Sequence, residues 1–571
     1  MGRIMKWSLA TADPSKTATL KGELGCSELM ARLLINRGLA NPEHAYKFLH
    51  PSLSDLHDPA LMCGLPRAVE RILEAVEKHE KILIYGDYDV DGMTAVVILR
   101  KAIQMLGGEV RYHIPRRLID GYGMKEDVIE RAAAEGFRLV ISVDTGIRSF
   151  EVVRAASALG LDTIITDHHL PEEDEAGQTE IPQALAVLNP KRSDCGYPNE
   201  NLCGCGVAFK VVQALLQKTN RLSLLPSFLK IVAIGTVADV VPLVGENRVI
   251  VKFGLERLAQ PANVGLKALL EISGLKDKKI LSSDIGFRIA PRINAVGRMG
   301  GANEVVELFS TDDESVTRSL AEKMNQMNSE RQQIEQHILQ SIDEQLTRDP
   351  ALTEDLVMVL AGEGWHRGVI GIAASKVLEK YHRPTLILAC EDGVAQGSGR
   401  SIKAFHLLRA LDQVQDLFTR YGGHSHAVGF SLPVERIAEL RQRLNAYARA
   451  VLTPEDLIPS LEIDAEVRLS DLDDQLYAEM VSLEPYGEGN PVPTFVARDL
   501  RMVYEPRILK EKHLKLRVEQ DGVSLDALGW GMGARLNGGA GRGREISMAF
   551  QLNQNTFQAV TSLQLTIKDF E

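Results

Sequence analysis

The chain has 571 residues, of which 45% are hydrophobic and 25% are charged. This composition is typical of globular proteins and excludes a fibrous, collagen-like or largely disordered chain, and at about 150 residues a domain the length predicts two to four domains. Six cysteines without a regular spacing exclude a disulfide-stabilised secreted scaffold and favour a reducing, cytoplasmic location.

The charge and hydropathy patterns exclude two further classes. A net charge of −12 argues against a protein that coats nucleic acid indiscriminately, because neutralising phosphates needs clustered lysine and arginine. A nucleic-acid enzyme whose carboxylates bind metal remains compatible with this charge. The N-terminus lacks the apolar core of a signal peptide, and the apolar run IVAIGTVADVVPLV is interrupted by Asp239, so we expect no membrane span.

The first half of the chain predicts an α/β domain. Residues 1–80 have the pattern of a helical lead-in, and we expect the domain itself over residues 81–310. Between residues 81 and 189 short apolar runs (KILIYG, VRYHIP, LVISV, DTIIT, ALAVL) alternate with helical patterns. This alternation predicts a mostly parallel sheet with helices on its faces, and after residue 189 the pattern becomes mainly helical.

The second half predicts a long helix and two further domains. Apolar residues recur at helical intervals from Glu314 to Leu346, which predicts a connecting helix within 311–348 that spans roughly 48 Å. A second, smaller mixed α/β domain is expected over 349–454. Residues 455–571 show strand-like runs separated by turns, which predicts a small antiparallel barrel.

Acidic residues follow three of the predicted strands. In YGDYDVDG, Asp87, Asp89 and Asp91 alternate, so in an extended chain they share one face, and Gly92 permits a tight turn into a helix. Farther along, LVISV ends at Asp144 and DTIIT ends at the triplet 167–169, Asp-His-His. The carboxyl ends of parallel strands meet where open sheets place their ligands. We therefore expect these side chains to share one crevice.

Such a cluster requires cations. Two carboxylates about 5 Å apart repel each other by roughly 3 kcal/mol at an effective dielectric constant near 20. A single aspartate at a strand end is more often a helix cap or turn former, but three such ends in succession with a histidine pair favour a metal site. Carboxylate and imidazole ligands without thiolate favour two Mn²⁺ or Mg²⁺ ions over structural zinc, and Asp167 is expected to orient a histidine. The acids of this cluster are Asp87, Asp89, Asp91, Asp144 and Asp239.

These residues resemble the DHH phosphoesterase superfamily, whose name matches the triplet Asp167-His168-His169. Within it, the motifs follow the order of the RecJ family of single-strand-specific exonucleases from about residue 20 to near the end of the chain. The resemblance implies a DHH domain, a DHHA1 domain separated from it by a cleft, and an OB-like barrel that binds nucleic acid. The motifs are GDYDVDG, DTGI, TDHH, IGTVADVVPL, PRINAVGRM, GWHRGVIGIAASKV, GSGRS and GGHSHAVGF.

The resemblance also implies roles for individual residues. Metal ligands are expected at Asp87, Asp89, Asp91, Asp144, His168, His169 and Asp239. Catalysis is expected to involve Asp144, His168, His169 and His424, the last near the scissile group. Contacts to the DNA strand are implied for Arg117, Tyr122 and Arg298, and Ser398 with Arg400 is implied to anchor a terminal 5′-phosphate.

The function implied is processive hydrolysis of single-stranded DNA from the 5′ end to 5′-mononucleotides, in DNA repair and recombination, by a two-metal in-line mechanism. The enzyme is expected to be a monomer, with a single-strand-binding protein and a RecQ-type helicase as partners. Two alternatives stay open: a DHH phosphodiesterase that cuts short oligonucleotides or cyclic dinucleotides, and a non-catalytic replication scaffold. The hundred or so residues after the second α/β domain favour a long strand as substrate.

Two smaller signals have more than one interpretation. The segment from Arg498 to Arg517 contains seven basic and three acidic residues, and Tyr504 and Trp530 lie nearby in the sequence. This pattern fits a groove that binds single strands. It equally fits a solvated charged face with both aromatic rings in the barrel core. Thr145 and the run LCGCGVAF depart from the usual pattern of the family. The cysteines at 195, 203 and 205 are expected to be buried free thiols rather than zinc ligands.

Overall fold

The computed structural model describes residues 5–116, 120–121, 123–173, 179–538, 543–558 and 560–571. The chain divides into two compact units. The barrel unit comprises the N-terminal residues up to Asp55, Pro242–Gly245 and Ile458–Glu571. The α/β unit comprises Leu56–Val241 and Glu246–Leu457.

The α/β unit begins with a five-stranded sheet in the order β3-β2-β4-β5-β8, and every pair in it is parallel. The expected parallel sheet is therefore confirmed. Because β3 lies on one side of β2 and β4 on the other, the connections diverge between β2 and β4, which opens a crevice at the carboxyl ends of these two strands. The strands are β2 (Lys81–Tyr85), β3 (Val110–His113), β4 (Phe137–Val143), β5 (Asp162–Thr166) and β8 (Ala186–Leu188).

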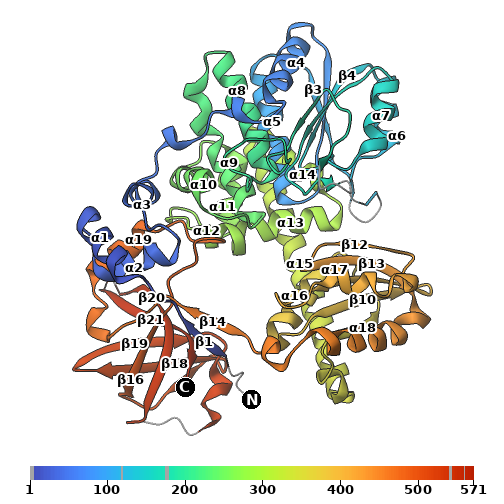
Figure 1. The fold of residues 1–571 in the computed structure, drawn as a ribbon. Helices are drawn as coiled ribbons and strands as arrows, with labels where there is room; N and C mark the ends of the chain where they lie inside the picture. The colour runs from blue at the N-terminus through green and yellow to red at the C-terminus, as the bar shows by residue number, and fades with distance from the viewer. Residues whose placement is uncertain (1–4, 117–119, 122, 174–178, 539–542, 559) are drawn as a thin grey trace. The chain divides into compact units, whose positions relative to one another are not determined.

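Helices cover both faces of this sheet (Figure 1). Leu83, Val140 and Ile165 pack against the helices of one face, and alternate residues such as Ile84 and Ile141 are fully buried beneath the other. Burial on both sides explains why the strands are apolar throughout. One face carries α4 (Leu65–Glu77), α5 (Val90–Met105) and α8 (Gly204–Lys218), and the other carries α6 (Glu126–Ala134) and α7 (Phe150–Ala158).

A mainly helical segment follows the sheet, as expected. It contains a π-helical turn at Ile285–Ile289, directly before α13. A short antiparallel pair, β6 (Glu172–Glu173) and β7 (Thr179–Glu180), precedes β8. The helices are α9 (Leu229–Ala238), α10 (Gly245–Leu258), α11 (Val264–Ile272), α12 (Ser282–Asp284), α13 (Ala290–Met299) and α14 (Ala302–Ser310).

The expected long helix is α15 (Glu314–Arg348), whose 35 residues span about 52 Å. Its first turn is capped by Asp313, whose side chain accepts hydrogen bonds from the backbone N–H groups of Ser315 and Val316. Met324, Ile338 and Ile342 are buried at helical intervals. Across the described part of the chain, no helix combines the length and the apolar composition needed to cross a membrane.

After α15 comes a second five-stranded sheet, in the order β12-β13-β11-β10-β9. Only the β9–β10 pair is parallel, so the expected mixed α/β domain is confirmed. Its strands are β9 (Met358–Glu363), β10 (Thr385–Glu391), β11 (Val394–Arg400), β12 (Arg420–Gly423) and β13 (Ala427–Pro433), and its helices are α16 (Ile370–Tyr381), α17 (Leu407–Asp412) and α18 (Ile437–Val451).

The barrel unit contains both ends of the chain. Strand β1 (Lys6–Leu9) pairs in parallel with β14 (Ser460–Ile463), beside the barrel (Figure 1). Leu20, Leu33 and Phe48 of the N-terminal helices share one core with Phe495 and Phe550 of the barrel, which the helical pattern of residues 1–80 did not reveal. The helices are α1 (Pro14–Leu24), α2 (Glu28–Asn36), α3 (Pro42–Leu49) and α19 (Asp474–Ser482).

Five strands of the barrel unit close into a ring, because β16 pairs with both β18 and β20. The expectation of a purely antiparallel barrel is wrong in one pair, since β19 and β21 run parallel. A ring with an odd number of strands cannot alternate direction throughout, so at least one neighbouring pair must be parallel. The strands are β15 (Ala465–Glu466), β16 (Phe495–Met502), β17 (Arg507–Leu509), β18 (His513–Gln520), β19 (Val523–Gly529), β20 (Glu545–Phe557) and β21 (Val560–Phe570).

Candidate metal centre

The loop between β2 and α5 carries the first acidic residues. Asp89 caps α5, and its Oδ1 accepts a hydrogen bond of 3.0 Å from the backbone N–H of Gly92. A Cβ at Gly92 would lie 2.7 Å from the backbone of Asp87, so only glycine allows the chain to fold back this tightly. The turn leaves Asp87 and Asp91 buried at the carboxyl end of β2.

Asp91 is held by the first residues of α8. Its carboxylate accepts hydrogen bonds from the backbone N–H groups of Gly204 (2.6 Å) and Cys205 (2.8 Å). N–H groups at a helix start have no partner within the helix and carry partial positive charge, so they stabilise an anion. Burial and the charge of Asp89 nevertheless raise the pKa of Asp91 to about 6.

Asp144 follows β4 and has a left-handed backbone, with φ of 60°, which is uncommon for residues other than glycine. Its side chain is almost completely buried, and its Oδ1 accepts no hydrogen bond within the described residues. A Cβ at Gly204 would lie 2.5 Å from Oδ1 of Asp144, so α8 approaches Asp144 as closely as glycine permits. Burial, followed by the charges of nearby aspartates, raises the pKa of Asp144 well above its usual value.

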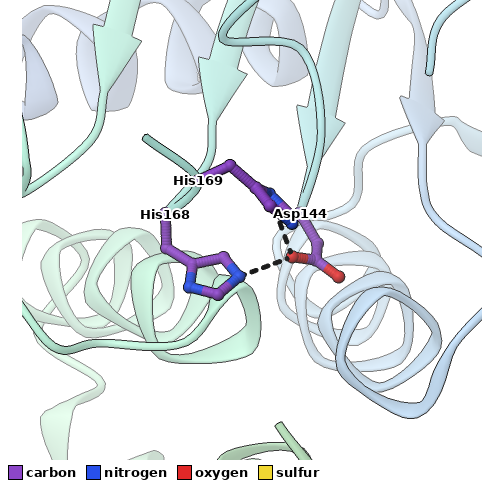
Figure 2. Close-up of side chains that lie close together, drawn as sticks. All are labelled: Asp144, His168 and His169. Carbon is purple, nitrogen blue, oxygen red and sulfur yellow. Dashed lines mark ion pairs between the residues drawn. The ribbon is translucent and has the colours of Figure 1, made fainter. Parts of the chain in front are cut away.

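The two histidines after β5 approach the same oxygen of Asp144 (Figure 2). Nε2 of His168 lies 3.1 Å from Oδ1 of Asp144, and Nδ1 of His169 lies 4.0 Å from it. On its other side, Nδ1 of His168 lies 3.7 Å from Oδ2 of Asp239. Burial and the positive charge of His169 lower the pKa of His168 to about 3, which keeps its imidazole in the neutral form that binds metals.

Asp167 is hydrogen-bonded on both oxygens. Oδ1 accepts from the backbone N–H groups of His168 (2.7 Å) and His169 (3.1 Å), and Oδ2 accepts from that of Ile147 (2.9 Å). Oδ1 also lies 2.7 Å from Nδ1 of His169. Burial raises the pKa of Asp167, but the hydrogen bond with His169 and the charges of both histidines outweigh it and lower the pKa to about 2.

Asp239 lies at the end of α9. The next residue, Val240, has φ of 59°, a conformation that is strained for a β-branched side chain. Burial and the charges of Asp91 and Asp89 raise the pKa of Asp239 to about 9. Its Oδ2 accepts no hydrogen bond from any described residue.

The ligand atoms of these residues form three groups, in each of which all atoms lie within 4.8 Å of one another. Asp144 and His168 each belong to two groups. Within the described chain, three buried ligand atoms lack hydrogen bonds: Oδ1 of Asp144, Oδ2 of Asp239 and Nδ1 of His168. A bound divalent cation would satisfy these atoms and neutralise the carboxylates. The groups are Asp144, His168 and His169; Asp91, His168 and Asp239; and Asp87, Asp89 and Asp144.

A second cluster lies on β11. Nη1 of Arg400 donates to Oγ of Ser398 (3.3 Å) and to the carbonyl oxygen of Gly399 (2.8 Å). A Cβ at Gly371, in the first turn of α16, would lie 2.9 Å from Oγ of Ser398 and 3.3 Å from Nη2 of Arg400. A hydroxyl, a guanidinium and a helix N-terminus therefore come together, and all three are groups that bind phosphate.

The resemblance also implied roles for four residues outside these two clusters, and the structure describes two of them. Arg298, in the last turn of α13, donates from Nη1 to the carbonyl oxygen of Gly368 (2.8 Å). His424 lies in the turn between β12 and β13, and burial and the positive charges of Arg148, His169 and Lys191 lower its pKa. The turn therefore lies near the histidine pair. The remaining two, Arg117 and Tyr122, fall outside the described residues.

Comparison with known proteins assigns the three parts of the chain. The DHH family, N-terminal domain, matches residues 81–236, the DHHA1 domain matches 354–450 and the RecJ OB domain matches 463–569. The single-stranded-DNA-specific exonuclease RecJ of Bacillus subtilis (strain 168) is 37% identical over 99% of this chain and 70% of its own length. The chain belongs to the RecJ family. RecJ of Dickeya dadantii (strain 3937) is 36% identical over 95% of both chains.

Solved RecJ structures agree with this membership. RecJ of Thermus thermophilus in complex with Mn²⁺ superimposes with a TM-score of 0.84 at 29% identity, over 99% of this chain and 79% of that one. The same protein in complex with Mg²⁺ gives a TM-score of 0.78 at 28% identity, over 99% and 78%. The resemblance drawn from the motifs, and the order of DHH, DHHA1 and OB domains, are therefore confirmed.

In this RecJ-family chain the basic stretch of the barrel divides into two parts. Arg498 pairs with Glu466, and Arg501 pairs with Glu519. Lys515 and Arg517 both pair with Asp526, at 3.1 and 3.2 Å. The remaining three, Arg507, Lys510 and Lys512, lie on β17 and in the turn after it. Tyr504 and Trp530 are 60% and 61% exposed, so the interpretation that placed both rings in the core is wrong.

The cysteines at 195, 203 and 205 are free, as expected, but Cys195 is only partly buried, so the expectation of a buried thiol is wrong at that position. Cys203 and Cys205 are buried, and none of the candidate metal groups within the described chain contains a cysteine. The contact between the backbone of LCGCGVAF and Asp91 was not among the predictions. The sequence did carry a signal for this contact. In LCGCGVAF, Cys203 can cap a helix, and two spaced glycines precede an apolar run. This pattern indicates a helix start whose N–H groups other residues can approach closely.

Proposed function

We propose that this chain is a metal-dependent exonuclease that hydrolyses single-stranded DNA processively from the 5′ end to 5′-mononucleotides, in DNA repair and recombination. The observation that carries the proposal is the gathering of five aspartates and two histidines into three potential ligand groups at the crevice of the first sheet. Membership of the RecJ family, whose curated relatives are named single-stranded-DNA-specific exonucleases, supports the choice of substrate.

The proposed cofactors are two Mn²⁺ or Mg²⁺ ions, held by Asp87, Asp89, Asp91, Asp144, His168, His169 and Asp239. RecJ of Thermus thermophilus was solved with each of these metals, and oxygen and imidazole ligands suit both. When bound, such ions acidify a water molecule and neutralise charge on the phosphoryl oxygens. The protein's contribution is to hold the ligands in place, through the α8 amides on Asp91 and through Asp167 on His169.

The other proposed contacts set the position of the strand. Ser398 and Arg400, with the start of α16, bind the terminal 5′-phosphate, because a guanidinium gives charged, bidentate hydrogen bonds to phosphate oxygens. Arg298, Arg117 and Tyr122 hold the strand behind it. With its terminal phosphate anchored there, the strand presents the first phosphodiester bond to the metals and to His424, which accounts for 5′ polarity and for release of mononucleotides.

We further propose a DHH domain over 81–310, a DHHA1 domain over 349–454 and an OB-like domain over 455–571. A connecting helix within 311–348 joins the first two. The helices of residues 1–80 are divided between the barrel unit and the α/β unit. The enzyme is proposed to act as a monomer in the cytoplasm. A single-strand-binding protein and a RecQ-type helicase are its proposed partners, because a strand-specific exonuclease needs a source of unpaired DNA.

Product analysis on one oligonucleotide tests the proposal. A 5′-phosphorylated single strand labelled at its 3′ end is incubated with Mn²⁺, with EDTA, and with the variant Asp144→Ala. We expect labelled fragments that shorten from the 5′ end, and mononucleotides, only with Mn²⁺ and the unsubstituted chain. Release of the label before the strand shortens, or no cleavage with Mn²⁺, would contradict the proposal. Faster cleavage of dinucleotides than of long strands would favour the short-substrate alternative instead.

A further inference from the structure

Phe287 is the most exposed large apolar side chain among the described residues, at 83%. It lies in the π-helical turn Ile285–Ile289, directly before α13. A phenyl ring that faces water contributes little to folding, and π-helical turns occur frequently at functional sites. The turn therefore presents a ring whose use lies outside the core of the protein.

Phe287 stands at one end of a partly exposed strip on α13, whose other end adjoins the loop that carries Asp87 and Asp89. Pro291, Asn294 and Arg298 follow it at intervals of three or four residues, which places them on one side of the helix, while the opposite side is buried. We call Phe287, Pro291, Asn294 and Arg298 the α13 strip. Eleven residues separate its ends, or about 16 Å at helical rise.

The buried side of α13 contacts the acidic loop at the Arg298 end of the helix. A Cβ at Gly297 would overlap the carbonyl oxygen of Tyr88, so α13 packs directly on the segment that carries Asp87 and Asp89. Arg298 is the next residue. The Arg298 end of the strip therefore lies next to the segment that carries Asp87 and Asp89.

The charge around the strip suits a polyanion. Residues 285–301 contain three arginines and no acid, within a chain whose net charge is −12, and one of the three, Arg288, pairs with the carboxylate of Asp284 at 3.3 Å. Just before them, residues 276–284 add three lysines against two aspartates. Clustered basic side chains in an otherwise acidic protein attract phosphate chains to that part of the surface.

We infer that Phe287 stacks on a base of the single strand as the strand runs along the α13 strip to the metal centre. Stacking on an aromatic ring tolerates any sequence, because every base has a π face. A base within a duplex has both faces covered by its neighbours, so this contact also favours unpaired DNA. The inference rests on the proposed function and adds a residue that positions the substrate and discriminates single strands from duplexes.

Photocrosslinking locates the contact directly. Single strands that carry 5-iodouracil at one position each, from the second to the eighth nucleotide, are bound in EDTA, irradiated, and mapped by mass spectrometry. Iodouracil forms adducts with aromatic rings on which it stacks. We expect an adduct on Phe287 for one or two adjacent positions. Adducts that map only to other residues would overturn the inference.

Substitutions separate stacking from a structural role. Removing one stacked base contact costs about 1–3 kcal/mol, which is roughly a five- to 150-fold rise in Kd. We expect Phe287→Ala and Phe287→Leu to weaken binding by this factor and to raise KM more than they lower kcat, while Phe287→Trp restores binding. Leu222→Ala, which alters another exposed apolar residue of the α/β unit, is the control and should leave both values unchanged.

The outcomes also separate this inference from the proposed function. If the unsubstituted chain neither binds nor cuts single strands with Mn²⁺ present, the proposed function fails. If it cuts them, and Phe287→Ala and Phe287→Leu bind as tightly as the unsubstituted chain, the inference fails alone. An equal loss in Phe287→Trp and Phe287→Ala, or a lowered Tm in all three variants, would show a structural role and would also overturn it.

Discussion

Asp167 and His169 form a close pair, with 2.7 Å between Oδ1 of the carboxylate and Nδ1 of the imidazole. This contact makes the two neighbouring histidines different. Burial lowers the pKa of both imidazoles, but for His169 the hydrogen bond that its ring donates to Asp167 outweighs burial and raises the pKa, whereas the pKa of His168 falls to about 3. One carboxylate therefore fixes the orientation and the charge of one ring while its neighbour stays neutral.

Asp167→Asn should lower the pKa of His169, because the neutral amide removes the negative charge that favours the protonated ring. It should also weaken Mn²⁺ binding by about 10- to 100-fold, the usual cost of losing a partner that orients a ligand. NMR titration of the metal-free protein measures the pKa, and calorimetry measures the metal affinity. Asp343→Asn, which alters an exposed ion pair with Lys380, is the control. Unchanged Mn²⁺ affinity in Asp167→Asn would contradict the orienting role.

Gly204→Ala should disable the metal centre although Gly204 is not a ligand. Its new methyl group would lie 2.5 Å from Oδ1 of Asp144, so either the carboxylate or the start of α8 must move, and Asp91 loses its amide partners if α8 moves. A displacement of about 1 Å at a reaction centre can cost roughly a hundredfold in rate. We expect kcat on a single strand to fall by about this factor.

The matched control for this change is Gly196→Ala. A Cβ at Gly196 meets no atom within 4 Å, so this substitution adds a methyl group in the same unit without displacing anything. We expect its kcat and Tm to equal those of the unsubstituted chain. Equal activity in both variants would show that α8 and Asp144 adjust to the methyl group at no cost.

The sequence allowed the centre to be predicted because strand ends are local features. The aspartates at 87 and 144 directly follow apolar runs, and a parallel sheet brings the ends of such runs to one edge. The contacts of Asp91 could not be predicted in this way. Its partners, Gly204 and Cys205, are more than a hundred residues away, and backbone amides leave no residue type to read.

The same distinction between local and non-local features explains one omission and one error in the predicted fold. Residues 1–80 have a helical pattern, but a pattern of buried positions does not say which partner covers them, and Leu20 and Leu33 pack in the core of a barrel that begins four hundred residues later. Individual strands of the barrel were visible as apolar alternation. The parallel pair of β19 and β21 follows only from closure of a five-stranded ring, which is a property of the whole sheet.

The stability of the metal-free protein should depend on pH through these carboxylates. Burial raises the pKa of Asp91 to about 6 and that of Asp239 to about 9, whereas aspartates of the unfolded chain titrate near about 3.9. Between these values the folded state binds more protons than the unfolded state, so the contribution of both groups to the free energy of unfolding falls as pH rises from about 4 to about 9.

Thermal unfolding in EDTA at pH 6 and pH 8.5 measures this dependence. We expect Tm of the unsubstituted protein to be lower at pH 8.5 than at pH 6, and Asp239→Asn to show a smaller difference because one of the buried aspartates with a raised pKa no longer titrates. Mg²⁺ should reverse the trend, since it binds the ionised carboxylates. An identical change of Tm in Asp239→Asn and the unsubstituted protein would contradict the assignment of this dependence to Asp239.

Removal of the barrel tests how the units depend on each other for folding. A chain that ends near Pro454 keeps α1–α3 but loses the barrel residues that share their core, so it exposes Leu20, Leu33 and Phe48, and we expect it to aggregate. Fully burying one such side chain is worth about 1.5–3 kcal/mol, and loss of several exceeds the usual margin of stability. Residues 56–457 should instead remain monomeric, provided that Leu243, which packs on Gly487 of the barrel unit, is changed to serine.

Size-exclusion chromatography distinguishes the two truncated chains, and product lengths at limiting enzyme report processivity. The fragment 56–457 with Leu243→Ser should cut short oligonucleotides but leave many partly shortened products from a long strand, because it has lost the barrel that retains the strand between cleavages. If it degrades long strands as processively as the full chain, the barrel has no such role. If the chain that ends at Pro454 is instead monomeric with an unchanged Tm, α1–α3 do not need the barrel to fold.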